Sequence, residues 1–94
     1  MPELGDAELE RVARRWHQLP LDRALLAYPG VRDVVQLLAD DIARETGKAR
    51  VPVPDLGPAV AMDQLRVMVH DWRRAGLPEG DLGGRLIALR RKLP

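Results

Sequence analysis

The sequence predicts an all-α fold, a compact bundle of four to five short helices with one proline-rich connector. Apolar residues recur three and four positions apart over most of the 94 residues. Glycine and proline interrupt this pattern at a few points, and the one strand-like stretch has no second strand with which to pair. Helices this short are not stable alone, so their apolar stripes are expected to face one another in a single domain over residues 1–94.

The N-terminal part of the chain is expected to form two helices. The first covers residues 6–19, with Asp6 in position to cap its first turn and Pro20 to end it. A short helix at 22–28 follows, capped by Asp22. The Pro-Gly pair after it is expected to break the helix, because proline removes a backbone donor and clashes with the preceding turn.

The strongest helical pattern runs over residues 31–46, with Gly47 placed as a left-handed C-terminal cap. The connector, residues 48–58, is rich in proline and is long enough to cross one end of a bundle. A further helix is expected at 56–75, with proline tolerated in its first turn. The last helix is expected at 81–92, capped by an aspartate, although two glycines weaken its first turn.

Composition excludes several kinds of chemistry. The chain has no serine and no cysteine, which rules out a serine or cysteine nucleophile and a cysteine-ligated zinc site. Its two histidines, His17 and His70, have no helical spacing to a second ligand, and Asp40 and Asp41 diverge by about 100° around a helix axis. The sequence therefore predicts no enzyme, no catalytic residue, no metal and no cofactor.

The location expected from the sequence is the cytoplasm, without a membrane segment. No run of 18 apolar residues occurs, and the first residues are acidic where a signal peptide carries positive charge. The 13 arginines against two lysines indicate translation from a GC-rich genome.

Two basic ridges are candidates for an anion or nucleic-acid surface. Each lies on the outer side of an expected helix, and together they contain Arg11, Arg14, Arg15, Arg66, Arg73 and Arg74. The alternative is that both are solvated faces, neutralised by acidic neighbours at Asp33, Asp40 and Asp41. The net charge of +1 weighs against nucleic acid, because such binding depends on a cationic excess.

Four apolar residues fall outside the inner stripes of their helices, and they are candidates for an interaction surface: Leu37, Val60, Val67 and Ile87. With Leu56 and the connector valines they are numerous enough for a patch that binds a partner. The alternative is that helices around one core need wide apolar faces. Trp16 and Trp72 lie on the inner stripes and are expected in the core.

The sequence thus supports a non-enzymatic helical module that binds another protein or a second copy of itself as a homodimer. The alternative hypothesis is a nucleic-acid-associated accessory protein that uses the arginine-rich helix faces. Salt distinguishes the two, because phosphate binding weakens steeply with salt whereas apolar association persists.

Overall fold

The apolar stripes form four α-helices in the computed structural model, which describes residues 4–94 and contains no strand among them. This confirms the all-α class. The helices are α1 (Leu4–Gln18), α2 (Leu21–Glu45), α3 (Ala61–Arg74) and α4 (Glu79–Lys92), and a single 3-10 turn, η1 (Pro58–Val60), precedes α3.

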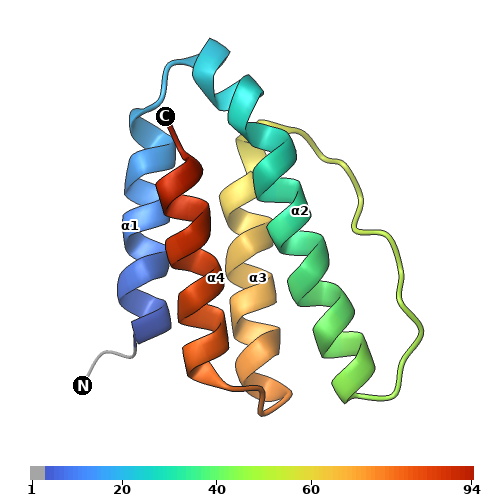
Figure 1. The fold of residues 1–94 in the computed structure, drawn as a ribbon. Helices are drawn as coiled ribbons and strands as arrows, with labels where there is room; N and C mark the ends of the chain where they lie inside the picture. Colours follow the sequence, from blue (N-terminus) through green and yellow to red (C-terminus); the bar gives the residue numbers. More distant parts are fainter. Residues whose placement is uncertain (1–3) are drawn as a thin grey trace.

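The chain runs along α1, returns along α2, runs along α3 in the same direction as α2, and returns along α4 (Figure 1). The main contacts join parallel helices, α1 with α4 and α2 with α3. Parallel neighbours need a long return, and residues 46–57 provide it along the side of α2. An extended chain advances about twice as far per residue as a helix, so the connector can return along a helical segment with about twice as many residues.

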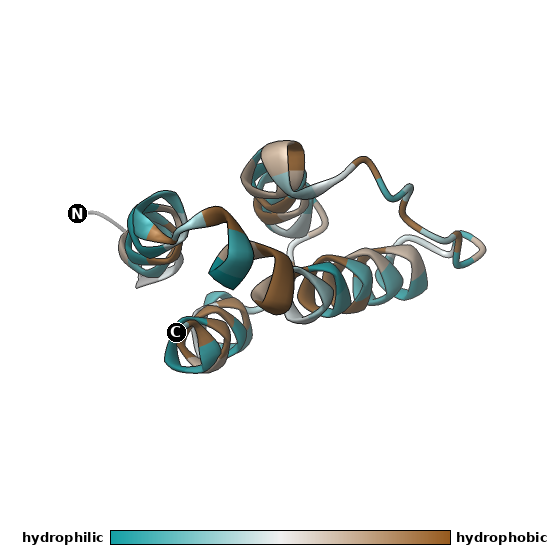
Figure 2. Cartoon of the chain, turned by 90° about the horizontal axis from the view of Figure 1, so that it is seen from above, coloured by the Kyte–Doolittle hydropathy of each residue, from teal (hydrophilic) through white to brown (hydrophobic). Residues whose placement is uncertain are grey.

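The bundle is flat, with Cα extents of 39 × 33 × 17 Å. In the view along the helices, α1 and α3 form one layer and α4 and α2 form the other, so that α1 faces α4 and α3 faces α2 (Figure 2). Sixteen buried apolar side chains from all four helices form the core between these layers. Trp16 and Trp72 are among them, which confirms that both tryptophans are core residues.

The break predicted between helices 22–28 and 31–46 is wrong, because α2 continues through Pro29. The buried stripe explains this: Ala24 and Val31 lie seven residues apart on one face and both pack into the core. Burial across the proline outweighs the lost hydrogen bond. The first turns of α2 are set at an angle to the rest (Figure 1), as expected for an internal proline.

The predicted aspartate caps are also wrong, because each of these helices begins before its aspartate. Asp6, Asp22 and Asp81 all lie within first turns, where their charge favours the helix dipole. Prolines stand at the N-caps of α2 and α4 and preset the backbone for entry into the helix. Both weak glycines, Gly83 and Gly84, lie inside α4.

The predicted C-terminal cap at Gly47 is confirmed. Its φ is +69°, and the amides of Gly47 and Lys48 donate to the carbonyls of Arg44 and Ala43. These two bonds form a Schellman motif, which requires a residue that adopts the left-handed conformation without strain.

The predicted helix 56–75 begins later than expected. Residues 56 and 57 remain extended, Pro58 begins η1, and α3 starts at Ala61. The connector occupies residues 46–57 instead of 48–58, and Asp55 and Gly57 are held by the Tyr28 side chain of α2 rather than by helical hydrogen bonds. In residues 4–94 there is no helix long and apolar enough to cross a membrane.

Candidate functional site

One face of α2 holds the connector in place. Tyr28, Arg32 and Gln36 lie four residues apart on this face, so their side chains point the same way. The guanidinium of Arg32 donates to the carbonyl of Val53 at 3.2 Å and lies 3.5 Å from the carboxylate of Asp55. The connector therefore has a defined path along α2.

The Gln36 side-chain amide forms two hydrogen bonds with the backbone of the extended connector, as a neighbouring strand would do. Its Nε2 donates to the carbonyl of Val51 at 3.1 Å, and its Oε1 accepts from the amide of Val53 at 2.8 Å. On the other side of the connector, Gln64 of α3 donates to the carbonyl of Pro54 at 2.9 Å. These bonds fasten the connector to both α2 and α3.

The end of the connector is fixed by Tyr28. Its hydroxyl donates to Asp55 at 2.6 Å and accepts from the amide of Gly57 at 3.0 Å. Donation to the carboxylate raises the pKa of Tyr28, and the same bond lowers the pKa of Asp55. At neutral pH this bond therefore joins a neutral phenol to a charged carboxylate.

The fixed connector and α3 form an open hollow of about 380 Å³, which we call the α3–connector groove. Its apolar lining consists of Val53, Pro54, Leu56, Val60, Val67 and Met68. Asp63 and Gln64 are its polar residues, and Leu56 and Val67 are exposed. An apolar hollow with a fixed backbone on both sides can receive the apolar side chains of another protein chain.

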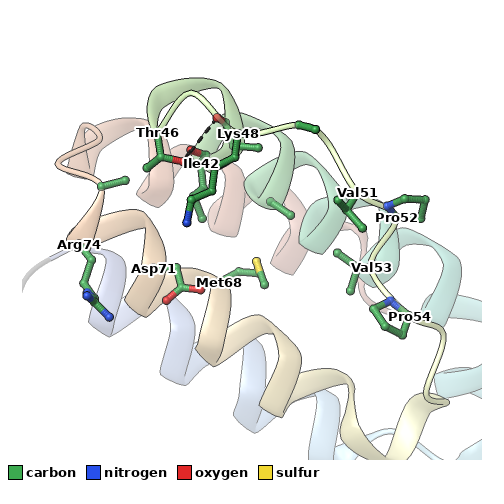
Figure 3. A pocket seen from close by; sticks show the side chains of 14 residues that line it. Ile42, Thr46, Lys48, Val51, Pro52, Val53, Pro54, Met68, Asp71 and Arg74 are labelled. Carbon is green, nitrogen blue, oxygen red and sulfur yellow. Dashed lines mark hydrogen bonds between the residues drawn. The ribbon is translucent and has the colours of Figure 1, made fainter.

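A second hollow, of about 550 Å³, lies between the C-terminal halves of α2 and α3 and adjoins the groove (Figure 3). Lys48, Asp71 and Arg74 gather at one end of it, and Val53 and Pro54 lie at the other. Several lining residues are alanines, whose short side chains leave the space between the two helices unfilled. Apolar surface thus continues from the groove along the inner side of the connector.

The structure separates the four predicted interaction residues. Val60 and Val67 both line the α3–connector groove, whereas Leu37 and Ile87 line none of the described hollows. Leu37 is exposed on α2 and Ile87 is half-buried on α4. The candidate surface therefore retains two of the four residues, together with Leu56 and Val53 of the connector, which were already expected to contribute to the patch.

One of the two predicted arginine ridges, Arg66, Arg73 and Arg74 on α3, lines a hollow of about 440 Å³ whose lining includes Leu9 of α1. Acidic side chains pair with two of its three guanidinium groups. Arg66 pairs with Glu10 at 2.7 Å. Arg73 pairs with Asp6 at 2.6 Å and with Glu79 at 2.7 Å. These contacts, the one with Glu79 foremost, raise the pKa of Arg73.

The predicted source of neutralisation is wrong. The acidic partners of the ridges come from α1 and α4 rather than from α2, because α1 packs against α4 and borders α3. Asp41 instead pairs with Arg44 and Arg85. Of the ridge arginines, Arg14, Arg15 and Arg74 are exposed and form no ion pair within residues 4–94.

The two histidines do not form a site. His17 and His70 are both exposed, and His70 lies 3.5 Å from its neighbour Asp71. Within the described part of the chain, no group of three or more histidine, aspartate or glutamate side chains is arranged to hold a metal ion.

The sequence contains a signal for the connector contacts that the helical periodicity does not use. A polar residue recurs every fourth position at Tyr28, Arg32 and Gln36, beside a stripe that is otherwise apolar. Such a row predicts a polar partner along one helix face, and the proline-rich connector is the segment that supplies free backbone groups.

Comparison with protein-family models, with curated proteins and with solved structures finds no match in any of the three.

Replacing Gln36 with alanine tests how the connector is held. The change frees the Val53 amide, so we expect its hydrogen exchange to accelerate about tenfold and the free energy of unfolding to fall by about 1 kcal/mol. Exchange measured by NMR reports the first effect and urea denaturation the second. Gln18→Ala is the control, because Gln18 is exposed and has no described side-chain hydrogen bond. Unchanged exchange at Val53 in the Gln36 variant contradicts the assignment.

Proposed function

We propose that the protein is a non-enzymatic helical module that binds another protein chain through the α3–connector groove. The observation that carries the proposal is the groove itself, whose lining is apolar apart from Asp63 and Gln64 although it is open to solvent. Burying apolar surface contributes roughly 25 cal/mol per Å², so an exposed groove of this kind favours association. The polar contacts of the connector keep the groove formed before a partner arrives, which lowers the entropic cost of binding.

Val67 and Leu37 provide a matched pair for the test. Both are exposed helical residues, at 52% and 51%, and only Val67 lines the groove. A glutamate at position 67 places a charge in the buried interface, so we expect Val67→Glu to weaken binding about a hundredfold and Leu37→Glu to leave it unchanged.

The experiment has two steps. Light scattering over a range of protein concentrations and salt measures self-association of the wild type and both variants. Immobilised wild type and variants then capture proteins from an extract, and each captured protein is purified and titrated by calorimetry. Association of either kind that is lost in Val67→Glu and kept in Leu37→Glu supports the proposal. Association that ignores Val67→Glu, or that both variants abolish, overturns it.

The nucleic-acid alternative rests on Arg14, Arg15 and Arg74, the ridge arginines without an ion pair in residues 4–94. Two adjacent cations on α1 and one on α3 give a weak phosphate-binding surface compared with a continuous stripe. Binding of labelled DNA or RNA that falls steeply with salt and weakens in Arg14→Gln supports this alternative. The cytoplasmic location expected from the sequence stays a prediction.

A further inference from the structure

The exposed face of α3 carries two opposite charges with apolar residues beside them. Asp63, Val67 and Arg74 are exposed on one side of α3, because consecutive members are separated by close to whole numbers of helical turns. Asp63 and Arg74 stand eleven residues apart, which is about 16 Å along the helix and about 20° around it. Val67 lies between them, at the edge of the α3–connector groove.

Neither charge has a partner within the described residues. Asp63 and Arg74 are exposed and form no ion pair or side-chain hydrogen bond there, in contrast to Arg66 and Arg73 on the same helix. An acid near the N-terminus of α3 and a base at its C-terminus make this face complementary to a copy of itself running in the opposite direction.

We propose that the groove is occupied by α3 of a second copy, packed antiparallel about a two-fold axis. The inference rests on the proposed function and names its partner. When Asp63 of each copy lies opposite Arg74 of the other, the axis passes halfway between them, close to Val67. The two Val67 side chains then meet beside the axis, at the edges of the two grooves, and each groove faces the C-terminal half of the other α3. The interface is isologous, so it closes as a dimer and does not extend into a filament.

Other arrangements fit less well. A parallel second copy places Asp63 against Asp63 and Arg74 against Arg74, which is repulsive. The antiparallel arrangement also aligns the two helix dipoles favourably. The broad face of the flat bundle, which contains α3, has Cα extents of 39 × 33 Å. It is therefore large enough for the roughly 800 Å² that each partner buries in a stable interface.

Reversing the two charges tests the arrangement directly. Asp63→Arg alone places arginine against arginine at both ends, and Arg74→Asp alone places aspartate against aspartate. We expect each single variant to dimerise at least about tenfold more weakly than the wild type. An equimolar mixture of the two variants restores both attractive pairs, so we expect a heterodimer about as stable as the wild-type dimer.

Native mass spectrometry and light scattering measure the dimers, with Asp81→Arg and Arg14→Asp as a control mixture in which no preference for heterodimers is expected. High salt should reduce the differences between variants while the wild-type dimer persists. Weak single variants with a restored mixture support the proposal. Single variants that dimerise like the wild type, or a mixture without heterodimers, overturn it. A wild type that is monomeric at millimolar concentration also overturns it, while binding of a different protein that depends on Val67 then still supports the proposed function.

Discussion

Replacing Trp72 with alanine is expected to lower the free energy of unfolding by about 3–5 kcal/mol, a large part of the stability of a domain this size. Trp72 is fully buried among the helices, and its indole Nε1 donates to the carbonyl of Pro78 at 3.0 Å. The guanidinium of Arg85 lies over its ring, 5.6 Å from the centroid. The substitution therefore leaves a cavity and removes one of the two hydrogen bonds to the carbonyl of Pro78, which also accepts from the amide of Leu82.

Urea denaturation followed by circular dichroism measures this effect without relying on tryptophan fluorescence. The corresponding fall in Tm is about 15–30 °C. Trp72→Phe retains most of the volume and loses the hydrogen bond, so we expect a smaller cost of about 1–2 kcal/mol. Leu26→Ala is the control, because Leu26 is exposed and its truncation leaves no cavity. A cost below about 1 kcal/mol for Trp72→Ala contradicts the assigned packing.

The consequence of the tryptophan for function follows from its position on α3. Trp72 anchors the inner face of the helix whose outer face carries Val67. Arg85 contacts the ring and also pairs with Asp41 of α2, so it helps to fix α2 relative to α3. Loss of this anchor is expected to change the spacing of the groove as well as the stability of the fold.

Helical periodicity predicted most of the core, although it missed the buried Ala24 and Met62. Val12, Leu38 and Leu86 were all expected on inner stripes and are all buried, because a residue's face on a helix depends only on its position in the turn. Helix boundaries were less accessible to this reasoning. At Pro29 the local preference for a break opposes burial on both sides of it, and the balance depends on what α2 packs against.

The candidate site was predictable only in part. Val60 and Val67 were identified because they are apolar on an outward face, yet nothing in their spacing shows that the connector passes beside them. That path is set by Gln36 and Tyr28, which bind backbone atoms and side chains of residues 51–57. The polar row on α2 indicates that this helix face has a polar partner, but it does not identify residues 51–57 as that partner, so the groove emerged only from the folded chain.

Glu8 is expected to be the most important charged residue for stability. Its side chain joins α1 to the end of α4, with Oε2 accepting from Arg90 at 3.0 Å and Oε1 from Arg11 at 2.6 Å. The residue is only 3% exposed, whereas the two arginines are partly solvated. We expect Glu8→Ala to cost about 2–3 kcal/mol, less than for a pair whose partner stays fully buried, because the freed arginines can be hydrated.

The ion pairs of Glu8 also predict how stability depends on pH. Burial tends to raise the pKa of this carboxyl, but the hydrogen bonds from Arg90 and Arg11 outweigh it and hold the pKa below its usual value of 4.5. Because the folded pKa is lower than the unfolded one, the contribution is complete above the unfolded value and is lost as the pH falls through the folded value. Urea denaturation between pH 7 and pH 3 should therefore show a smaller loss of stability in Glu8→Gln than in the wild type.

Glu10→Gln is the matched control, since Glu10 pairs with Arg66 in an exposed position and its loss should cost at most about 0.5 kcal/mol. Equal pH profiles for the wild type and Glu8→Gln contradict this role, whereas a difference confined to Glu8→Gln assigns the acid sensitivity to the contact between α1 and α4.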